Sequence, residues 1–321
     1  LEQVTRALRV TGEQQVRREE EDVAEWRQGI VTRSPLMEDL LGQARLVASS
    51  EASVFIHGQS GTGKELLARA IHNASTRAQG DFVAVNCSAI PESLFESEFF
   101  GHTKGAFTGA ETGQVGYLES NHRGTVFLDE IGNIPLEVQE KILRVVEYST
   151  FERVGGSQSV EVDVRIIAAT NADIETMLAA GTFREDLYYR LRVIPIKLPP
   201  LRSRKEDIPE LIKHFLHEYS LKRGIPMSVA KDAMDCLLEY HYPGNVRELK
   251  NLIERVFMLS ETHVIGVEDL PGEVRGATKG ECPLTGDDWR GMTLSQILKC
   301  TERKVISEIM KEVQGNKLKA A

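Results

Sequence analysis

The sequence predicts an α/β fold with a mainly parallel sheet, followed by a small helical domain. Short apolar, β-favouring segments alternate with helical stretches up to about residue 204, and this alternation is typical of a parallel sheet. Beyond that point only helical periodicity remains. A third observation is a glycine-rich loop between a predicted strand and a predicted helix, which places a phosphate-binding site in the α/β part.

Composition limits the classes of protein that the chain can represent. Its 321 residues, 41% hydrophobic and 27% charged, suit a globular protein of about two or three domains. The net charge of −9 argues against polyanion binding by the whole chain, so contact with nucleic acid requires a local basic patch or a further segment. Scattered cysteines favour a reducing compartment and argue against a structural zinc. With no signal peptide and no membrane-length apolar run, we predict a cytoplasmic protein without a membrane partner.

Residues 1–33 are predicted to form a charged helical linker. Val23, Trp26 and Ile30 recur at helical spacing. Earlier apolar residues fit a heptad, but Gly12 interrupts it. A solvated connector is therefore favoured over a dimerising signalling helix.

The α/β subdomain is predicted over residues 34–203 and the helical subdomain over residues 204–270. The predicted strands are 53–58, 81–87, 124–130 and 162–170, with helices at 64–75 and 135–149 between them. The helical subdomain has predicted helices at 206–224, 229–242 and 245–260. A Gly-, Pro- and charge-rich linker follows over 271–292, and an amphipathic helix is predicted from Leu294 to about Val313.

The glycine-rich loop reads GQSGTGKE over residues 58–65. Its G-x-x-x-x-G-K spacing lets backbone N–H groups surround phosphates, while Lys64 reaches the β and γ oxygens at the positive end of a helix. The alternative, a turn that only links strand to helix, is disfavoured by this context. The predicted nucleotide contacts are Gly58, Gln59, Ser60, Gly61, Thr62, Gly63, Lys64 and Glu65. Because Glu65 occupies the usual Ser/Thr position, Mg²⁺ must be held by another carboxylate and by water.

Asp129 and Glu130 end the predicted strand 124–130. The carboxyl ends of parallel strands open onto the ligand crevice, so Asp129 can orient Mg²⁺ and Glu130 can act as general base. The alternative is a polar strand end without catalytic role. Thr170 and Asn171 end the strand 162–170 in the same way. Local sequence does not decide whether they contact the γ-phosphate or only cap a turn.

Residues 105–110, GAFTGA, are predicted to form an exposed glycine-rich turn. The segments on either side are polar, and glycines near both ends can act as hinges. An isolated exposed phenylalanine needs no functional explanation, so the pattern alone leaves its role open.

The combination of these segments resembles the AAA+ domain of bacterial enhancer-binding proteins, ATPases that activate transcription by RNA polymerase carrying sigma-54. The resemblance spans roughly residues 30–270 and rests on GQSGTGKE, NCSAIPESLFESEFFGHTKGAFTGA, GTVFLDEIGNIP, ILRVVE, FERVGGS, AATNAD, GTFREDLYYRL, LPPLRSRKEDI and YPGNVRELKN in this order. It implies a P-loop ATPase fold whose parallel sheet core is followed by a small helical-bundle subdomain, with ATP and Mg²⁺ as cofactors. Glu65 is a substitution typical of that family.

The resemblance also assigns roles to single residues. It makes Asn86 a switch that pairs with Glu130, makes Thr170 and Asn171 the first sensor, and makes Arg247 the second sensor. Arg184 and Arg190 match arginines that enter a neighbouring subunit's ATP site; from sequence alone, surface salt bridges with Glu185 and Asp186 are the favoured alternative. Ile30 and Val31 are expected near the adenine. The contacts with sigma-54 are expected from Gly105, Ala106, Phe107, Thr108, Gly109 and Ala110.

Arginines acting in trans require a ring, and the resemblance implies dimers that assemble into hexamers or heptamers. It also implies that residues 293–321 are the truncated start of a Fis-type DNA-binding domain, so enhancer DNA is expected to bind only through the missing remainder of that domain. Residues 1–33 are then the end of a receiver domain of a two-component system, or a linker after one. Phe99, His122, Arg123 and Tyr242 depart from the family pattern, none at a catalytic position.

Two other functions remain open at this point. Another AAA+ remodelling ATPase would share Lys64, Asp129, Glu130 and the arginines in trans, but not GAFTGA. A regulatory scaffold that binds nucleotide without hydrolysis is disfavoured by the intact catalytic residues. The predicted function is ATP-driven remodelling of the sigma-54 closed complex.

Overall fold

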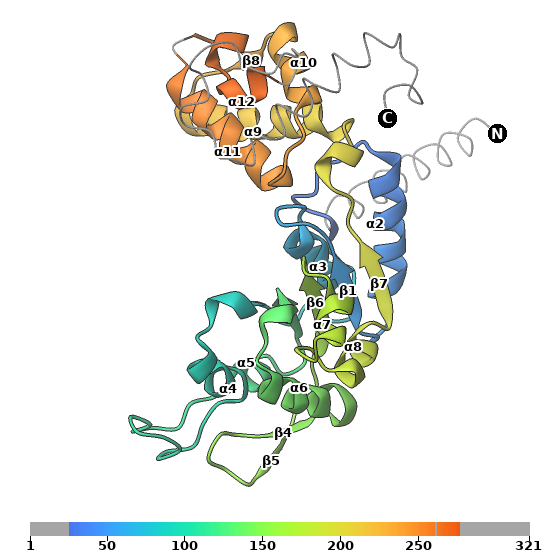
Figure 1. The fold of residues 1–321 in the computed structure, drawn as a ribbon, viewed down its shortest axis with the longest axis vertical. Helices are drawn as coiled ribbons and strands as arrows, with labels where there is room; N and C mark the ends of the chain where they lie inside the picture. Colours follow the sequence, from blue (N-terminus) through green and yellow to red (C-terminus); the bar gives the residue numbers. More distant parts are fainter. Residues whose placement is uncertain (1–25, 261, 277–321) are drawn as a thin grey trace, which may run out of the picture. The chain divides into compact units, whose positions relative to one another are not determined.

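The computed structural model of the chain describes residues 26–260 and 262–276 (Figure 1). The chain divides into two compact units. Within the described residues, the first unit contains residues 26–211 and Tyr242–Asn251, and the second contains Ile212–His241 with residues 252–260 and 262–276. Most of the predicted linker 1–33, most of the predicted linker 271–292 and all of the predicted segment 293–321 lie outside the described residues.

A five-stranded parallel sheet forms the centre of the first unit. Its strands are β1 (Val54–His57), β2 (Phe82–Asn86), β3 (Thr125–Asp129), β6 (Arg165–Thr170) and β7 (Ile194–Lys197), in the order β2-β3-β6-β1-β7. The first four confirm the predicted strands. β7 was not predicted, because it is short and interrupted by Pro195. Proline is tolerated there because an edge strand has a ladder partner on one side only.

Both faces of this sheet are buried, as a parallel sheet requires. Alternate residues of β1 point to opposite faces: Phe55 packs into one hydrophobic cluster, and Val54 and Ile56 into the other. Helices α4 (Glu92–Phe100), α6 (Leu136–Tyr148) and α8 (Glu185–Leu191) cover the Phe55 face. Helices α2 (Pro35–Ala48) and α3 (Lys64–Asn73) cover the opposite face. The α/β prediction is therefore confirmed.

Short elements complete the first unit. They are α5 (Tyr117–Ser120), α7 (Ile174–Ala179), the 3-10 turns η1 (Cys87–Ala89), η2 (Ile131–Asn133) and η3 (Leu201–Ser203), and an antiparallel hairpin of β4 (Thr150–Glu152) and β5 (Ser159–Glu161). The hairpin was not predicted, because each of its strands has only three residues.

The second unit is helical. Helices α9 (Asp207–Arg223) and α11 (Asn245–Leu259) begin in the first unit and continue into the second, which also contains α10 (Lys231–Glu239) and α12 (Gly272–Arg275). Helices α9, α10 and α11 confirm the three predicted over 206–260, whereas α12 lies in the segment predicted as a linker. A parallel pair, β8 (Ser228–Val229) with β9 (Val264–Ile265), and the turn η4 (Val267–Asp269) were not predicted.

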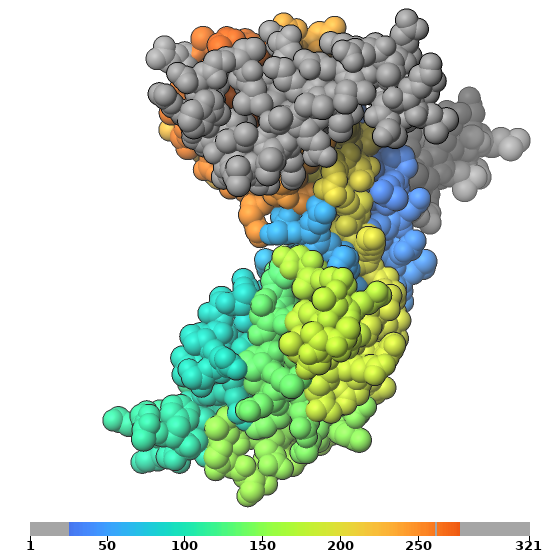
Figure 2. Space-filling model, viewed as in Figure 1, coloured from blue at the N-terminus to red at the C-terminus, as the bar shows by residue number. Residues whose placement is uncertain are grey.

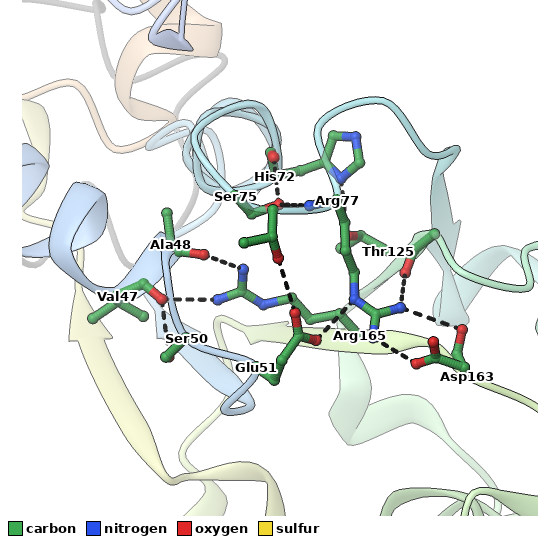
Figure 3. A network of polar contacts seen from close by, with 12 residues as sticks. Val47, Ala48, Ser50, Glu51, His72, Ser75, Arg77, Thr125, Asp163 and Arg165 are labelled. Atoms are coloured by element: carbon green, nitrogen blue, oxygen red, sulfur yellow. Dashed lines mark hydrogen bonds and ion pairs between the residues drawn. The ribbon is translucent and has the colours of Figure 1, made fainter.

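A polar network fixes the amino-terminal end of the sheet (Figure 3). Arg165 is the first residue of β6. Its buried guanidinium donates to the carbonyl oxygens of Ala48 (2.8 Å) and Val47 (3.1 Å) at the end of α2. A positive charge at this end of a helix is stabilising, because the helix dipole is negative there. Arg77 links Glu51 to Asp163 beside it. The network lies at the amino-terminal end of β6. Thr170 lies at the opposite end of this strand, where the polar residues of the candidate site are found.

Candidate nucleotide-binding site

The loop between β1 and α3 has the geometry of a phosphate cradle. Gly61 and Gly63 have φ values of 75° and 103°, a left-handed conformation that favours glycine. Lys64 begins α3 with its side chain only 6% exposed. Its Nζ donates to the carbonyl oxygen of Gly58 at 3.2 Å and to Glu130 Oε1 at 3.4 Å. The lysine is therefore held inside the loop, at the positive end of a helix.

The first turn of α11 packs against the outside of this loop. The backbone N–H groups of Val246 and Arg247 donate to Gly61 at 3.0 and 3.3 Å. The buried Asn245 amide donates to the carbonyl oxygen of Ser60 at 2.9 Å, and Arg247 Nη1 donates to Ser60 Oγ at 3.1 Å. Arg247 thus reaches the phosphate loop directly. The sequence did not reveal the part played by Asn245, although the preceding Pro-Gly marked a turn.

The close approach of the two segments predicts the effect of one substitution. A Cβ at Gly61 would collide with the carbonyl oxygen of Gly244, and its φ is unfavourable for alanine. We expect Gly61→Ala to destabilise the fold by at least about 1 kcal/mol from backbone strain alone and to weaken nucleotide binding. Denaturant unfolding and ATP-analogue titration measure both effects.

Gly42→Ala is the matched control. Gly42 lies in α2 with nothing within 4 Å of an added Cβ, so alanine should stabilise the fold by about 0.5–1 kcal/mol. Equal stability changes for the two variants would contradict the proposed tight contact at Gly61.

The carboxylates at the end of β3 face the lysine. Glu130 follows Asp129 with a left-handed φ of 53°, and its backbone N–H donates to Asp129 Oδ1 at 3.0 Å. Partial burial raises the pKa of the Asp129 carboxyl; Lys64 opposes this shift and Glu130 adds to it. Two carboxylates next to one lysine leave net negative charge, which a divalent cation would neutralise.

The end of β6 joins the phosphate loop to the glutamate. The backbone N–H of Gly58 donates to the carbonyl oxygen of Thr170 at 3.2 Å, and the backbone N–H of Asn171 donates to Glu130 Oε2 at 3.2 Å. The buried Thr170 hydroxyl accepts from Ala172 at 3.0 Å. Thr170 therefore serves the turn, as the capping alternative predicted, while Asn171 leaves its exposed side chain available for a ligand.

Asn86 ends the neighbouring strand, in register with Asp129. Its side-chain oxygen accepts from the backbone N–H and the hydroxyl of Ser88, at 3.0 and 2.7 Å. Within residues 26–260 and 262–276, Glu130 bonds instead to Lys64 and Asn171. The strand register brings Asn86 to the site, but the Asn86–Glu130 hydrogen bond expected from the resemblance is not formed here.

The donor set fits Mg²⁺ bound jointly with a nucleotide. In the part of the chain that the structure describes, no three His, Cys, Asp or Glu side chains converge to hold an ion by themselves. Mg²⁺ is commonly held by one or two carboxylates together with phosphate oxygens and water. Asp129 supplies such a carboxylate. Glu65 pairs with Arg69 on the surface of α3 at 3.1 Å.

The segment predicted to cover the adenine, Ile30 and Val31, is followed by residues that bind Asp207. Ile30 and Val31 are half-buried, and Ile30 packs on the core beside α2 and α3. The next residues bind Asp207 Oδ1, which accepts from the Thr32 hydroxyl at 2.8 Å and from two following backbone N–H groups. Asp207 also pairs with Arg204 at 3.6 Å, and Arg204 donates to the carbonyl oxygen of Thr62 in the phosphate loop at 2.9 Å. Sequence analysis missed this buried connection between residues 32–34 and the phosphate loop.

The two arginines of α8 stand apart from this cluster. Arg184 forms a bidentate pair with Asp186, at 3.0 and 2.7 Å. This is the surface pairing that sequence alone favoured, and it holds the pKa of the Asp186 carboxyl below its ordinary value. Arg190 is exposed and has no polar partner among the described residues. Neither arginine contacts the phosphate loop of its own chain.

The GAFTGA loop protrudes from the first unit, where it is drawn in teal at the lower left of Figures 1 and 2. A hydrogen bond between Gly105 N and the Ala110 carbonyl oxygen (2.8 Å) closes its base. Phe107 is 42% exposed, and its ring lies 4.9 Å from that of His102. Thr103 binds Val154 of the β4–β5 connection. The loop is therefore anchored at its base and open at its tip.

Comparison with known proteins identifies the families of the two domains. Residues 30–197 match the sigma-54 interaction domain family, and residues 202–285 match the AAA+ ATPase lid domain. Regulatory protein AtoC of Escherichia coli (strain K12) is 47% identical over 309 residues, covering 92% of this chain. DNA-binding transcriptional regulator NtrC of Azospirillum brasilense is 42% identical over 316 residues, covering 91% of this chain. The chain spans 65% and 66% of these two relatives.

A solved structure agrees with this fold. NtrX from Brucella abortus, crystallised in complex with ATP, is 36% identical and superposes with a TM-score of 0.76. The match covers 99% of this chain and 70% of NtrX. The resemblance stated from sequence motifs and the AAA+ fold are therefore confirmed. Within the described residues, no helix is long and apolar enough to cross a membrane.

Proposed function

This chain belongs to the sigma-54 interaction domain family of AAA+ proteins, and from that premise we propose that it hydrolyses ATP to remodel the sigma-54 RNA polymerase closed complex. One observation carries the proposal. Lys64 of the phosphate loop and the backbone of Asn171 both bind Glu130, and this site lies in the same compact unit as the exposed GAFTGA loop. The first feature suits hydrolysis, and the second suits contact with a protein partner.

The chemistry follows from what each residue can do. Backbone N–H groups of residues 58–64 and the Lys64 ammonium would bind the phosphates. Mg²⁺ bound with ATP would neutralise phosphate charge, with Asp129 as its protein ligand. Glu130 would orient the attacking water and accept its proton. In the present structure Lys64 lies 3.4 Å from Glu130, and a γ-phosphate would compete for the lysine.

Arg184 and Arg190 are proposed to act on a neighbouring subunit's ATP. Both lie on the surface of α8 and away from their own phosphate loop, so they are available to a second copy. Head-to-tail contacts that close make a ring, and an arginine supplied in trans stabilises charge on the transferring phosphoryl group. We propose a hexamer or heptamer that is built from inactive dimers.

The nucleotide state is proposed to move the GAFTGA loop through Asn86. The Asn86 amide now binds Ser88, and an exchange to Glu130 would give the end of β2 a second arrangement. η1 and α4 follow β2 and lead directly to the loop. Transition-state analogues of ATP are expected to favour the loop position that binds sigma-54.

The Thr108→Ala variant tests the loop assignment. Thr108 is exposed at the loop tip, so we expect unchanged ATP turnover and loss of sigma-54 capture in pull-downs with the ADP–aluminium fluoride complex. Thr112→Ala, an exposed position outside the motif, should retain capture. Normal capture by Thr108→Ala would exclude the loop as the contact.

ATP turnover measured against protein concentration separates a ring enzyme from a scaffold that binds nucleotide without hydrolysis. A ring enzyme should gain activity per subunit as it assembles, whereas a scaffold should stay inactive at every concentration. Because the proposed target is RNA polymerase, we place the protein in the cytoplasm.

A further inference from the structure

A buried glutamine on α6 joins two segments that the proposed function uses separately. Gln139 is 0% exposed. Its Nε2 donates to the carbonyl oxygens of Ile134 (2.9 Å) and Thr182 (3.2 Å). Its Oε1 accepts from the backbone N–H of Arg184 at 2.8 Å. Both donor hydrogens and the carbonyl of this amide are therefore used, in three bonds to main-chain atoms.

The bond to Ile134 holds the segment that follows the proposed catalytic residue Glu130. η2 follows Glu130 directly, and its turn is closed by Asn133 N donating to the Glu130 carbonyl oxygen at 3.0 Å and Ile134 N to that of Ile131 at 3.2 Å. Gln139 binds the carbonyl oxygen of Ile134, the residue that follows this turn. The segment between Glu130 and α6 is therefore held at both ends.

The other two bonds hold the residues before α8. Thr182 and Arg184 flank the buried Phe183, and Arg184 is the N-cap of α8. The Arg184 guanidinium is on the surface, but its backbone N–H points inward to Gln139. The position of the Arg184 Cα atom is therefore set by a side chain that lies in the core.

We propose that Gln139 is a positioning residue for Arg184. It ties the arginine that a subunit offers its neighbour to the segment that follows that subunit's own catalytic glutamate. The inference rests on the proposed ATPase function. A hydrophobic residue could fill the same volume. Burying an amide costs desolvation free energy, which is offset only when the amide forms hydrogen bonds, as Gln139 does. Misplacing a catalytic group by about 1 Å can cost about 100-fold in rate.

Gln139→Met is the first test, because it keeps the length and removes the three hydrogen bonds. In the full ring we expect ATP turnover to fall by about 10- to 100-fold. The affinity for an ATP analogue and the ring mass should be unchanged, because Gln139 contacts neither the phosphate loop nor the exposed face of α8. Glu147→Gln, an exposed change on the same helix, should turn over normally.

Subunit mixing separates a misplaced arginine from a damaged subunit. A Lys64→Ala subunit cannot hydrolyse ATP itself, but it carries an intact Gln139 and Arg184. Mixed with it, Gln139→Met subunits should regain turnover, because their own ATP sites receive a correctly placed arginine. Absence of rescue would overturn the proposal and indicate a defect in the subunit's own site or fold.

Two further comparisons complete the test. Should Gln139→Met fail to fold, Gln139→Leu removes the same three hydrogen bonds with another apolar side chain. It should show the same fall in turnover; normal turnover by an assembled Gln139→Leu ring would overturn the proposal. Wild type and Arg184→Ala report on the proposed function independently. An inactive wild type would reject that function, and full turnover by Arg184→Ala would reject the action of Arg184 in trans. Normal turnover by Gln139→Met beside an inactive Arg184→Ala would reject only the role of Gln139.

Discussion

Arg184→Ala is expected to lower ATP turnover in the assembled protein by about 10³- to 10⁵-fold. The guanidinium would stabilise charge that develops on the γ-phosphate only in the transition state, so its loss should reduce kcat and leave ATP affinity nearly unchanged. Steady-state turnover together with equilibrium binding of an ATP analogue separates the two effects. A parallel fall in affinity would point to ground-state binding instead.

The Arg184–Asp186 ion pair does not prevent this role. Both side chains are more than one third exposed, and exposed pairs of this kind contribute about 0.2–1 kcal/mol. A 10³-fold effect on rate corresponds to about 4 kcal/mol. Breaking the Arg184–Asp186 pair therefore costs much less than the transition-state stabilisation that Arg184 would supply.

Controls for this prediction come from the same helix region and from mixed rings. Arg192 lies just after α8 with its guanidinium 5.3 Å from the Tyr188 ring, and Arg192→Ala should keep turnover within a few-fold of wild type. Arg184→Ala mixed with Lys64→Ala should recover activity, since intact sites then receive intact arginines. Full turnover by Arg184→Ala alone would show that the arginine is not catalytic.

Local pattern predicted the strands that carry the site because each is a continuous apolar run ending in a polar residue. Asp129 and Thr170 are the last residues of β3 and β6, as the sequence indicated. β7 escaped prediction because Pro195 breaks its pattern. The β4–β5 hairpin escaped because three-residue strands carry too little periodicity for detection.

Contacts between the site and residues distant in the sequence could not be predicted from local sequence patterns. Asp207 binds residues 32–34, which lie more than 170 positions earlier in the chain. Asn245 holds Ser60 across a similar separation. Gln139 looks like an ordinary residue of an amphipathic helix until the fold brings Arg184 to it. Such residues show no local signal, because their function depends on which main-chain groups the tertiary structure leaves unpaired.

The hydrogen-bond partner of Asn86 is likewise absent from the sequence. The resemblance paired Asn86 with Glu130, and the strand register does bring the two strand ends together. Nevertheless, Asn86 binds Ser88 while Glu130 binds Lys64. A nucleotide-dependent exchange to an Asn86–Glu130 pair would require that the two arrangements differ by only a few kcal/mol, about the range of a ligand-shifted equilibrium.

Glu130→Gln provides the second large effect. Glutamine keeps the shape of the side chain and can still accept from the Asn171 N–H, which donates to Glu130 at 3.2 Å. It cannot take a proton from water. The loss of a general base predicts a fall in turnover of about 10²- to 10⁴-fold. Glu137→Gln, an exposed change in the first turn of α6, is the matched control and should turn over normally.

Binding should change in the opposite direction from turnover. Glu130 carries negative charge close to the lysine that would receive the phosphates, so neutralising it removes a repulsion and frees Lys64. ATP affinity of Glu130→Gln should therefore equal or exceed that of wild type. A marked loss of affinity would mean that Glu130 organises the loop rather than the water.

The same variant links hydrolysis to the partner. If the ATP state presents Phe107 and Thr108 to sigma-54, Glu130→Gln with ATP should hold sigma-54 for as long as ATP stays bound. Wild type should hold it only with a transition-state analogue, because turnover releases the loop. Pull-downs with ATP, ADP and the ADP–aluminium fluoride complex measure this difference. Equal capture by Glu130→Gln in ATP and in ADP would break the proposed connection between the catalytic glutamate and the GAFTGA loop, even if turnover falls as expected.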